Sequence, residues 1–417
     1  MGANHKTFTG GYKFNNFEGQ PSQGLILFNP VSDVNEVTIK FGQGVTAADV
    51  LEALQRTNLS GPQSALISTH GKIEPFKVKD IIVNMVEVEP YNLPSKNLLS
   101  IGNNAKFMFG LKDIHNSYSD AKITLVVGEN QIGLLKLLTQ NTDKLSWLDL
   151  VTVADKYPSN LKEMAIPLVL HKKYPVGYDP AHIAVVHLGI KDVLHVASVV
   201  SEKKTISSTA VALSGPGWKK NLVLDIPVGT KVKDLAQRYV AEGEMRFIKN
   251  SILTGEQLAL EDVVTFDTDL IIAVPEDRRR QTLTFLRSGK KADSFTNTFI
   301  SKLLPKSEKS VGTNLQGERR ACVSCSYCES VCPVGLIPHL LHKHGDKNII
   351  NKRLAEYKIF DCIECGLCNY VCLSKIEVLS NIKGAKEALE KSEISHNTYV
   401  IPQCDMVIDR KEVASGE

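Results

Sequence analysis

Near its C-terminal end, this 417-residue chain reads Cys322-Val323-Ser324-Cys325-Ser326-Tyr327-Cys328-Glu329-Ser330-Val331-Cys332-Pro333. The same spacing, Cys-x2-Cys-x2-Cys-x3-Cys, returns in Cys362-Ile363-Glu364-Cys365-Gly366-Leu367-Cys368-Asn369-Tyr370-Val371-Cys372-Leu373. Each Cys-x2-Cys step predicts a tight backbone loop whose thiolates turn toward one point, as a cubane iron–sulfur cluster requires. The two runs therefore predict two [4Fe-4S] clusters.

The cysteines are expected to cross between the two clusters. In two-cluster modules with this spacing, three cysteines of a run bind one cluster and the fourth binds the other. The expected metal ligands are Cys322, Cys325, Cys328 and Cys372 for the first cluster, and Cys362, Cys365, Cys368 and Cys332 for the second. Pro333 is the residue expected after such a run, whereas Leu373 departs from the pattern and leaves the second loop less constrained.

Other interpretations of the cysteines and of nearby side chains are weaker. Zinc sites also use Cys-x2-Cys pairs, but a long spacer normally separates the pairs. A disulfide framework would spread its crosslinks along the chain, whereas none of the nine cysteines precedes Cys322. The last of them, Cys404, is predicted to be a structural or incidental thiol. The connector's His339, His342 and His344 could tune a cluster or carry protons, but surface or helix-end histidines are more common.

The composition is that of an ordinary soluble globular protein, with 43% hydrophobic and 23% charged residues and a formal net charge of +3. This charge gives no reason to expect nucleic acid as a partner. The most apolar long segment, 183–200, contains Lys191 and Asp192, so no transmembrane helix is predicted. Since the first residues lack the apolar core of a signal peptide, we expect a cytoplasmic protein.

Ahead of the cysteine runs, the chain predicts a mixed α/β body. Short apolar segments typical of strands alternate with helix-like segments, which indicates βαβ units. The expected strands are 37–41, 80–86, 123–127, 183–188, 209–213 and 270–274, and the expected helices are 47–55 and 131–139. A strand over 222–226, a turn and a helix over 232–239 indicate a small β-grasp-like unit. The connector between the cysteine runs, 334–361, is predicted to be helical.

These patterns divide the chain into several expected domains. They are an N-terminal segment packing on the body (1–32), an α/β domain (33–177), a β-rich region (178–287) that includes the β-grasp unit (221–250), a basic linker (288–316), a helical two-cluster domain (317–389) and a C-terminal tail (390–417). The fold class expected is therefore α/β, with a C-terminal α-helical dicluster ferredoxin domain.

Several segments resemble two related families of redox subunits. The stretch Val83-Asn84-Met85-Val86-Glu87-Val88-Glu89-Pro90-Tyr91 is similar to a signature of the C subunit of Rnf electron-transport complexes, which also carries a helical two-cluster domain. Residues 174–193, 212–216 and 250–255 resemble the A subunit of sodium-translocating NADH:quinone reductases. The chain looks intermediate between these families, and its 221–250 unit resembles their soluble-ligand-binding β-grasp (SLBB-like) domain.

The resemblance implies an iron–sulfur electron-transfer subunit of a membrane-associated, ion-translocating oxidoreductase complex. Such a subunit would be peripheral on the inner face of the cell membrane and would relay electrons toward membrane-embedded partner subunits. NADH, quinone and ferredoxin are the candidate redox partners of that complex. The alternatives are a non-catalytic iron–sulfur adaptor and a soluble iron–sulfur oxidoreductase subunit.

The resemblance also implies a glycine-rich loop that holds FMN ahead of the Glu-x-Glu-Pro strand. The corresponding stretch, Leu59-Ser60-Gly61-Pro62-Gln63-Ser64-Ala65-Leu66, has one glycine and lacks the Gly-Gly-Ala-Gly-Phe-Pro motif. We therefore predict a protein without stoichiometric FMN. Glu87 and Glu89 are candidate residues of a nucleotide pocket, and solvated carboxylates at a strand end are the alternative. No catalytic residue is predicted.

Overall fold

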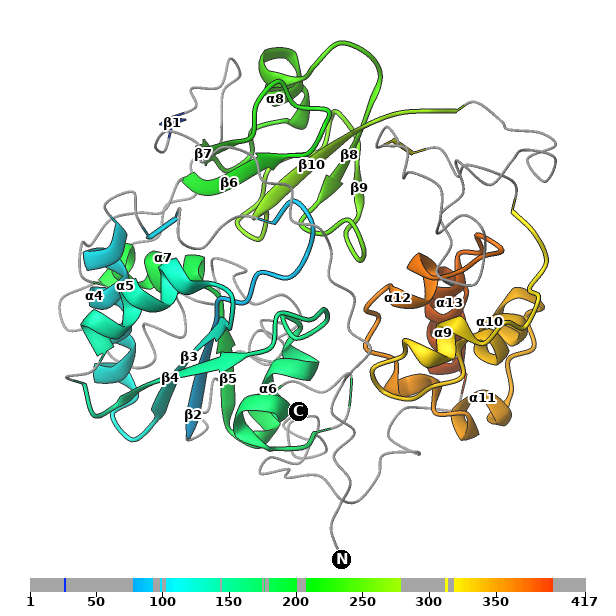
Figure 1. Ribbon diagram of the computed structural model, residues 1–417, viewed down its shortest axis with the longest axis horizontal. Helices are drawn as coiled ribbons and strands as arrows, with labels where there is room; N and C mark the ends of the chain where they lie inside the picture. The colour runs from blue at the N-terminus through cyan, green and yellow to red at the C-terminus, as the bar shows by residue number, and fades with distance from the viewer. Residues whose placement is uncertain are drawn as a thin grey trace, which may run out of the picture.

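The computed structural model describes residues 26–27, 78–92, 98–99, 103–142, 145–174, 176, 180–200, 208–278, 312–313 and 319–392. They form a parallel sheet with helices, a mixed sheet, and a helical C-terminal domain (Figure 1). The predicted strand 37–41, the predicted helix 47–55, the stretch 59–66 and Cys404 lie outside the described residues.

The first sheet is parallel, with the strand order β4-β3-β2-β5. Its strands are β2 (Asp80–Asn84), β3 (Lys122–Gly128), β4 (Leu148–Val153) and β5 (Val185–Leu188). Strand β3 is buried on both faces from Ile123 onward, which explains why its sequence after Lys122 is apolar except for Thr124 and does not alternate between apolar and polar residues. The sequence predicted β2, β3 and β5 at these places.

Helices pack beside this sheet, and two of them cross closely. The helices are α4 (Asn103–Ser117), α5 (Ile132–Thr142), α6 (Lys162–Leu170) and α7 (Ile190–Val200), with the 3-10 turn η1 (Pro180–Ile183) before β5. Helices α4 and α7 lie against each other at Gly110, where an added Cβ would stand 2.3 Å from the carbonyl oxygen of Val193. The absence of a side chain at Gly110 therefore sets the helix spacing.

The parallel sheet extends past residue 177, where the sequence places the end of the α/β domain. Strand β5 pairs with β2 in register Ile81 with Val186, and α7 then packs on α4. Because β2 is a central strand, it needs a partner on each side, and the second partner is supplied by a segment about a hundred residues later. The sheet and its helices therefore continue to Val200.

The second sheet has the order β1-β7-β6-β10-β8-β9. Its elements are β1 (Ile26–Leu27), β6 (Ser208–Ser214), β7 (Leu222–Pro227), α8 (Val232–Tyr239), β8 (Met245–Lys249), β9 (Gln257–Leu258) and β10 (Leu270–Pro275). The hairpin β6-β7 is followed by α8 and, later, by β10 parallel to β6, which is a β-grasp arrangement. This unit is larger than the expected range 221–250, because its central strands β6 and β10 lie outside that range.

The C-terminal domain is helical, as predicted. It contains α9 (Tyr327–Ser330), α10 (Pro338–Asp346), α11 (Lys352–Glu356), the 3-10 turn η5 (Ile359–Asp361), α12 (Leu367–Tyr370) and α13 (Val378–Glu390). Helices α10 and α13 pack together around a small apolar core that includes Leu341, Leu354 and Ile382. The fold class of a mixed α/β body with a helical C-terminal domain is confirmed. Within the ranges given above, no helix has both the length and the apolar character to cross a membrane.

Candidate metal centre

The two cysteine runs, which begin at Cys322 and 40 residues later at Cys362, have the same backbone conformation. Ser324 and Ser326 of the first loop have left-handed φ values of 53° and 59°, and Glu364 and Gly366 have φ values of 56° and 76° at the equivalent places. A four-residue helix follows each loop, α9 in the first run and α12 in the second. The repeated cysteine spacing is thus the sequence signal of a repeated structure.

The fourth cysteine of each run accepts a backbone hydrogen bond on its sulfur. The N–H of Leu336 donates to Sγ of Cys332 at 3.3 Å, and the N–H of Ile376 donates to Sγ of Cys372 at 3.4 Å. Hydrogen bonds to a ligand sulfur stabilise its thiolate form and help to set the potential of an iron–sulfur cluster. The last cysteine of each run therefore has the same backbone hydrogen bond to its sulfur.

Four expected ligands of the second cluster line one cavity. Cys332 reaches it from the first run and meets Cys362, Cys365 and Cys368 of the second, and Cys328 also lies on its wall. The remaining walls are mostly apolar and include Val334, Leu336, Leu379 and Ile382. Cys332 thus lies on the same cavity as the three cysteines with which the predicted ligand assignment groups it.

Burial disfavours the thiolate form of these cysteines unless a positive charge is bound beside them. It raises the pKa of Cys328 to about 11 and the pKa of Cys365 to about 12, and it raises the pKa values of Cys362 and Cys368 as well. A metal centre deprotonates a coordinating thiol outright because its positive charge compensates the thiolate. Among the described residues, no three His, Cys, Asp or Glu side chains are grouped so as to hold a single metal ion. Cys332, Cys362, Cys365 and Cys368, which all line the cavity, are the number and kind of ligands that a [4Fe-4S] cluster takes.

The second cysteine loop lies against the α/β body. The hydroxyl of Tyr157, which follows β4, donates a hydrogen bond of 2.6 Å to the carbonyl oxygen of Cys365. An added Cβ on Gly366 would stand 2.6 Å from the carbonyl oxygen of Leu253, so the backbones touch there. Ile363 and Leu367 share one apolar core with Val86 and other side chains of the parallel-sheet domain. The cavity wall and the body are therefore in direct contact.

Glu89, a candidate residue of a nucleotide pocket, has both carboxylate oxygens bonded to the chain itself. Asn160 Nδ2 donates to Glu89 Oε1 at 2.7 Å, and the hydroxyl of Ser251 donates to Glu89 Oε2. Ser251 Oγ in turn accepts hydrogen bonds from the N–H groups of Leu253 and Thr254. Desolvation raises the pKa of Glu89, which is 9% exposed, so the alternative of a solvated carboxylate is wrong for this residue. Glu89 joins the end of the β2 segment to the turn after β8.

Glu87, the other candidate, is half-buried two residues earlier. It lies on the same segment as Glu89, between the buried side chains of Val86 and Val88. The structure thus places both glutamates beyond the carboxyl end of β2. Of the two, Glu89 joins elements of the body through its hydrogen bonds to Asn160 and Ser251.

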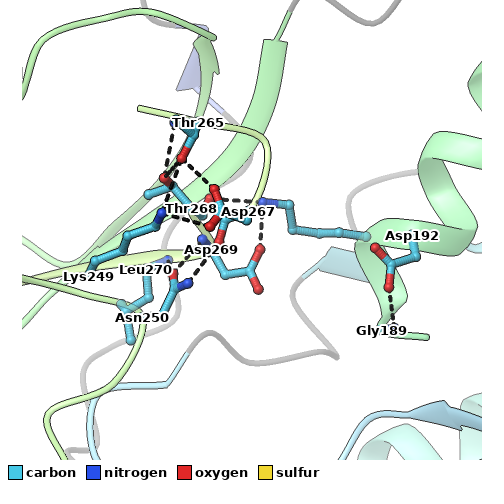
Figure 2. A network of polar contacts seen from close by, with 10 residues as sticks. Gly189, Asp192, Lys249, Asn250, Thr265, Asp267, Thr268, Asp269 and Leu270 are labelled. Carbon is cyan, nitrogen blue, oxygen red and sulfur yellow. Dashed lines mark hydrogen bonds and ion pairs between the residues drawn. The ribbon is translucent and has the colours of Figure 1, made fainter. Parts of the chain in front are cut away.

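The carboxyl edge of the parallel sheet is where doubly wound folds bind ligands, at the point where the strand order reverses. Here the reversal falls between β2 and β5. Asp192 Oδ2 accepts a hydrogen bond of 2.6 Å from the N–H of Gly189 at the start of α7 (Figure 2), and Asp155 Oδ2 accepts one of 2.7 Å from the N–H of Asn130 before α5. These carboxylates occupy the positions where backbone N–H groups would bind a phosphate, so these two turns do not fit a nucleotide phosphate.

Lys191, one of the two charged residues that interrupt the apolar segment 183–200, joins helix α7 to the turn before β10 of the mixed sheet. Lys191 Nζ donates to the carbonyl oxygen of Thr268 at 2.9 Å and pairs with Asp269 at 2.7 Å. Asn250 holds the same turn, because its Oδ1 accepts from the N–H of Asp269 (Figure 2). Sequence reasoning assigned no such role to Lys191, since its partners are far away in the chain.

The three connector histidines lie on α10 and make contacts within the helical domain. His342 is buried and its Nδ1 lies 2.7 Å from Asn381 Nδ2 on α13. His344 Nδ1 lies 2.9 Å from the carbonyl oxygen of Leu340, and His339 lies 3.9 Å from the carboxylate of Glu329. His342 thus differs from the expected surface or helix-end histidine, because it joins two helices.

The cysteine geometry and the fold define a ferredoxin-type iron–sulfur domain attached to an α/β body. Comparison with known families agrees, since residues 321–376 match the 4Fe-4S dicluster domain. The chain therefore carries a 4Fe-4S domain at its C-terminal end.

The chain is homologous to two kinds of redox subunit, which confirms the resemblance inferred from the sequence. It is 30% identical over 213 residues to the A subunit of the Na(+)-translocating NADH-quinone reductase of Alcanivorax borkumensis, covering 50% of this chain and 46% of that protein. It is 22% identical over 325 residues to the C subunit of the ion-translocating oxidoreductase complex of Buchnera aphidicola, covering 76% of this chain and 60% of that protein. The chain thus spans about half the length of the first relative and three fifths of the second.

Among solved structures, an NAD+-reducing [NiFe]-hydrogenase in the air-oxidized state aligns with a TM-score of 0.42 and 14% identity. The alignment covers 58% of this chain and 52% of the hydrogenase chain. That likeness is too weak to define the fold.

Proposed function

We propose that this chain is an iron–sulfur electron-transfer subunit of a membrane-associated, ion-translocating oxidoreductase complex. The observation that carries the proposal is the cavity in which Cys332 of the first run meets Cys362, Cys365 and Cys368 of the second. Two [4Fe-4S] clusters, when bound, supply one-electron transfer, and the homology to subunits of two ion-translocating complexes indicates the kind of assembly.

In this proposal, the described residues hold the second cluster against the body. The Tyr157 hydroxyl and the close packing of Gly366 on Leu253 fix the loop that contributes Cys365, so the body and this cluster are neighbours. We propose Cys322, Cys325, Cys328 and Cys372 as the ligands of the first cluster. We propose membrane-embedded subunits as partners, attachment at the inner face of the membrane, and NADH, quinone or ferredoxin as redox partners of the complex.

The proposal does not include FMN in this chain. The stretch 59–66 has one glycine, and Asp155 and Asp192 occupy two positions that a phosphate would need. Purified protein is expected to show broad iron–sulfur absorption and far less than one flavin per chain after acid extraction. One tightly bound FMN per chain would overturn this part of the proposal.

The metal content tests the cofactor, and membrane partners test the complex. Anaerobic analysis should find about eight iron and eight sulfide per chain, whereas stoichiometric zinc would contradict the cluster assignment. A tagged chain, purified from detergent-solubilised membranes, should bring multi-helix membrane subunits with it. Co-purification with a soluble dehydrogenase instead would favour the soluble oxidoreductase alternative. If the purified chain has oxidised clusters that no membrane fraction can reduce, the adaptor alternative is favoured.

A further inference from the structure

Equivalent positions of the two cysteine loops differ in their exposure to solvent. Val323 is 66% exposed, whereas its counterpart Ile363 is 8% exposed. Cys325 is exposed and Cys365 is buried. Because the two loops share one backbone conformation, the difference arises from the body, which covers the second loop.

This burial disfavours reduction of the second cluster. Four thiolates make a [4Fe-4S] centre anionic, and an electron that it accepts adds negative charge. Keeping such a charge away from water costs free energy unless a positive charge lies nearby. A cation beside the second loop would therefore offset the effect of burial on the reduction potential.

Lys386 of α13 supplies such a cation. Its Nζ donates to the carbonyl oxygen of Cys362 at 3.3 Å and lies 2.7 Å from Oε1 of Glu364. The side chain is 15% exposed, so its charge is screened less than that of a surface lysine. Burial raises the pKa of Cys362, and the positive charge of Lys386 opposes this rise because it favours the anionic sulfur.

Other charged side chains of the cysteine domain lie around this pair, and they carry both signs. Lys383 lies 3.3 Å from the second carboxylate oxygen of Glu364, but its side chain is 49% exposed. Asp361 precedes Cys362 in the chain and is half-buried. These two charges have opposite signs, and neither has the contact of Lys386 with the backbone of a ligand cysteine to its credit in the described structure.

The body also faces this pair with one carboxyl and one ammonium group. Burial raises the pKa of Glu163 on α6, and the positive charges of Lys162 and Lys386 oppose that rise. Glu364 adds to the rise because it is itself negative. The surroundings thus have no dominant sign, and what distinguishes Lys386 is its place beside Cys362.

In the first half of the repeat, a carboxylate takes the place of this cation. Helices α10 and α13 each begin six residues after the last cysteine of their run. The α10 counterpart of Lys386, 40 residues earlier, is Asp346, which is exposed. The counterpart of Glu364 is Ser324, and Lys343 donates to its hydroxyl at 2.9 Å. The inner lysine therefore belongs to the second half of the repeat.

We propose that Lys386 is a positioning residue of the second cluster: held by Glu364, it keeps a positive charge beside Cys362 and raises the reduction potential of that cluster. The inference rests on the proposed function, because it takes the second run to hold a cluster. The charge acts by stabilising the reduced, more negative form. One electron arrives from a redox partner of the complex, and no bond forms or breaks in this chain.

The test is an anaerobic redox titration of the full chain with its clusters bound. Dithionite and mediator dyes set the potential, and EPR follows the reduced clusters. Lys386→Met removes the charge at a similar side-chain length, whereas Lys386→Arg keeps the charge. The matched control is Lys383→Met, one turn earlier on α13, at a side chain that is 49% exposed.

In Lys386→Met, the equilibrium constant for reduction of one cluster should fall about tenfold, which is about 59 mV for a one-electron couple. The constant for the other cluster should change less than about twofold. Lys386→Arg should stay within about threefold of the parent protein. Lys383→Met should also change less than about threefold, because water screens its exposed charge.

A double variant separates the charge of Lys386 from its hydrogen bond to the Cys362 carbonyl. Glu364→Gln alone removes a carboxylate and should raise the potential of the same cluster. Combined with Lys386→Met, it removes one charge of each sign, so the equilibrium constant should return to within about threefold of the parent value. Because Glu364→Gln shifts the potential in the opposite direction, it tests the proposal even if Lys386→Met does not fold.

Several outcomes would overturn the role of Lys386. Parent-like potentials in Lys386→Met would do so, as would equal shifts of both clusters. A double variant that keeps the full shift of Lys386→Met would show that the hydrogen bond acts on the cluster and the charge does not. If iron is about eight per chain and membrane subunits co-purify but Lys386→Met leaves both potentials unchanged, this inference alone has failed. If iron is absent, the proposed function has failed.

Discussion

The hydroxyl of Tyr157 donates a buried hydrogen bond to the carbonyl oxygen of Cys365, a residue 208 positions further along the chain. Tyr157 stands at the carboxyl edge of the parallel sheet, and Cys365 lines the cavity of the second cysteine run. A residue that belongs to no metal-binding motif thus positions a candidate metal ligand.

Replacing Tyr157 by Phe is expected to destabilise the contact between the body and the cysteine loop. The buried carbonyl of Cys365 would lose its donor, which costs about 1–3 kcal/mol. Thermal unfolding should show a lower midpoint, and an EPR redox titration should show a shift in one of two cluster potentials.

Tyr118→Phe is the matched control for that experiment. The Tyr118 hydroxyl is buried without a hydrogen-bond partner, so its removal leaves no group newly unpaired. We expect an unchanged or slightly higher unfolding midpoint and unchanged cluster potentials. Equal losses in the two variants would show that the Tyr157 hydrogen bond contributes nothing specific.

Gly366→Ala is expected to disturb the second loop strongly. Its φ of 76° is unfavourable for alanine by about 1–2 kcal/mol, and the new Cβ would stand 2.6 Å from a backbone oxygen. The variant should lose iron from one cluster during purification. Gly384→Ala, in helix α13, has nothing within 4 Å of the added Cβ and should stabilise by about 0.5–1 kcal/mol. Normal iron content in Gly366→Ala would contradict the close packing.

Because Asp192 is buried, we expect the free energy of unfolding to fall as the pH rises. Burial raises the pKa of Asp192 from 3.8 to about 7, so the folded state holds a proton over a range in which the unfolded state has released it. The extra proton stabilises the folded state fully below about pH 4. This stabilisation, on the order of a few kcal/mol, is lost as the pH rises toward 7.

Asp192→Asn should remove that pH dependence, because the amide is neutral and its oxygen still accepts from the N–H of Gly189. The unfolding midpoint of the variant minus that of the parent protein should increase between pH 5.5 and pH 8. Asp149→Asn, at a side chain that is 45% exposed, serves as the control. A pH-independent difference between Asp192→Asn and the parent would contradict the prediction.

The crossed ligand assignment predicts different outcomes for Cys332→Ala and Cys372→Ala. Each variant should lose one cluster, so iron should fall from about eight to about four per chain. The cluster that remains in Cys332→Ala should be bound at the exposed first loop and should be quickly attacked by a chelator. The cluster that remains in Cys372→Ala should be bound beside the body and should be protected. The reverse order would show that each run binds its own cluster with all four cysteines.

Local sequence patterns predicted much of this protein. The cysteine spacing predicts the helical iron–sulfur domain because it acts over a dozen residues, and the apolar runs predict β2, β3, β6 and β10 for the same reason. The helix 232–239 was predicted at its observed bounds, since its turn and its amphipathic face are also local features. The duplicated motif also predicts the crossed ligand assignment, which remains a prediction.

Long-range packing decided the rest. Strand β5 joins the sheet beyond residue 177 because β2 needs a second neighbour, and Glu89 is buried because Asn160 and Ser251 reach it from distant segments. Tyr157 and Leu253 cover one cysteine loop and leave its repeat exposed. Two loops with the same local pattern therefore have different surroundings, because burial depends on which distant residues come to lie beside them.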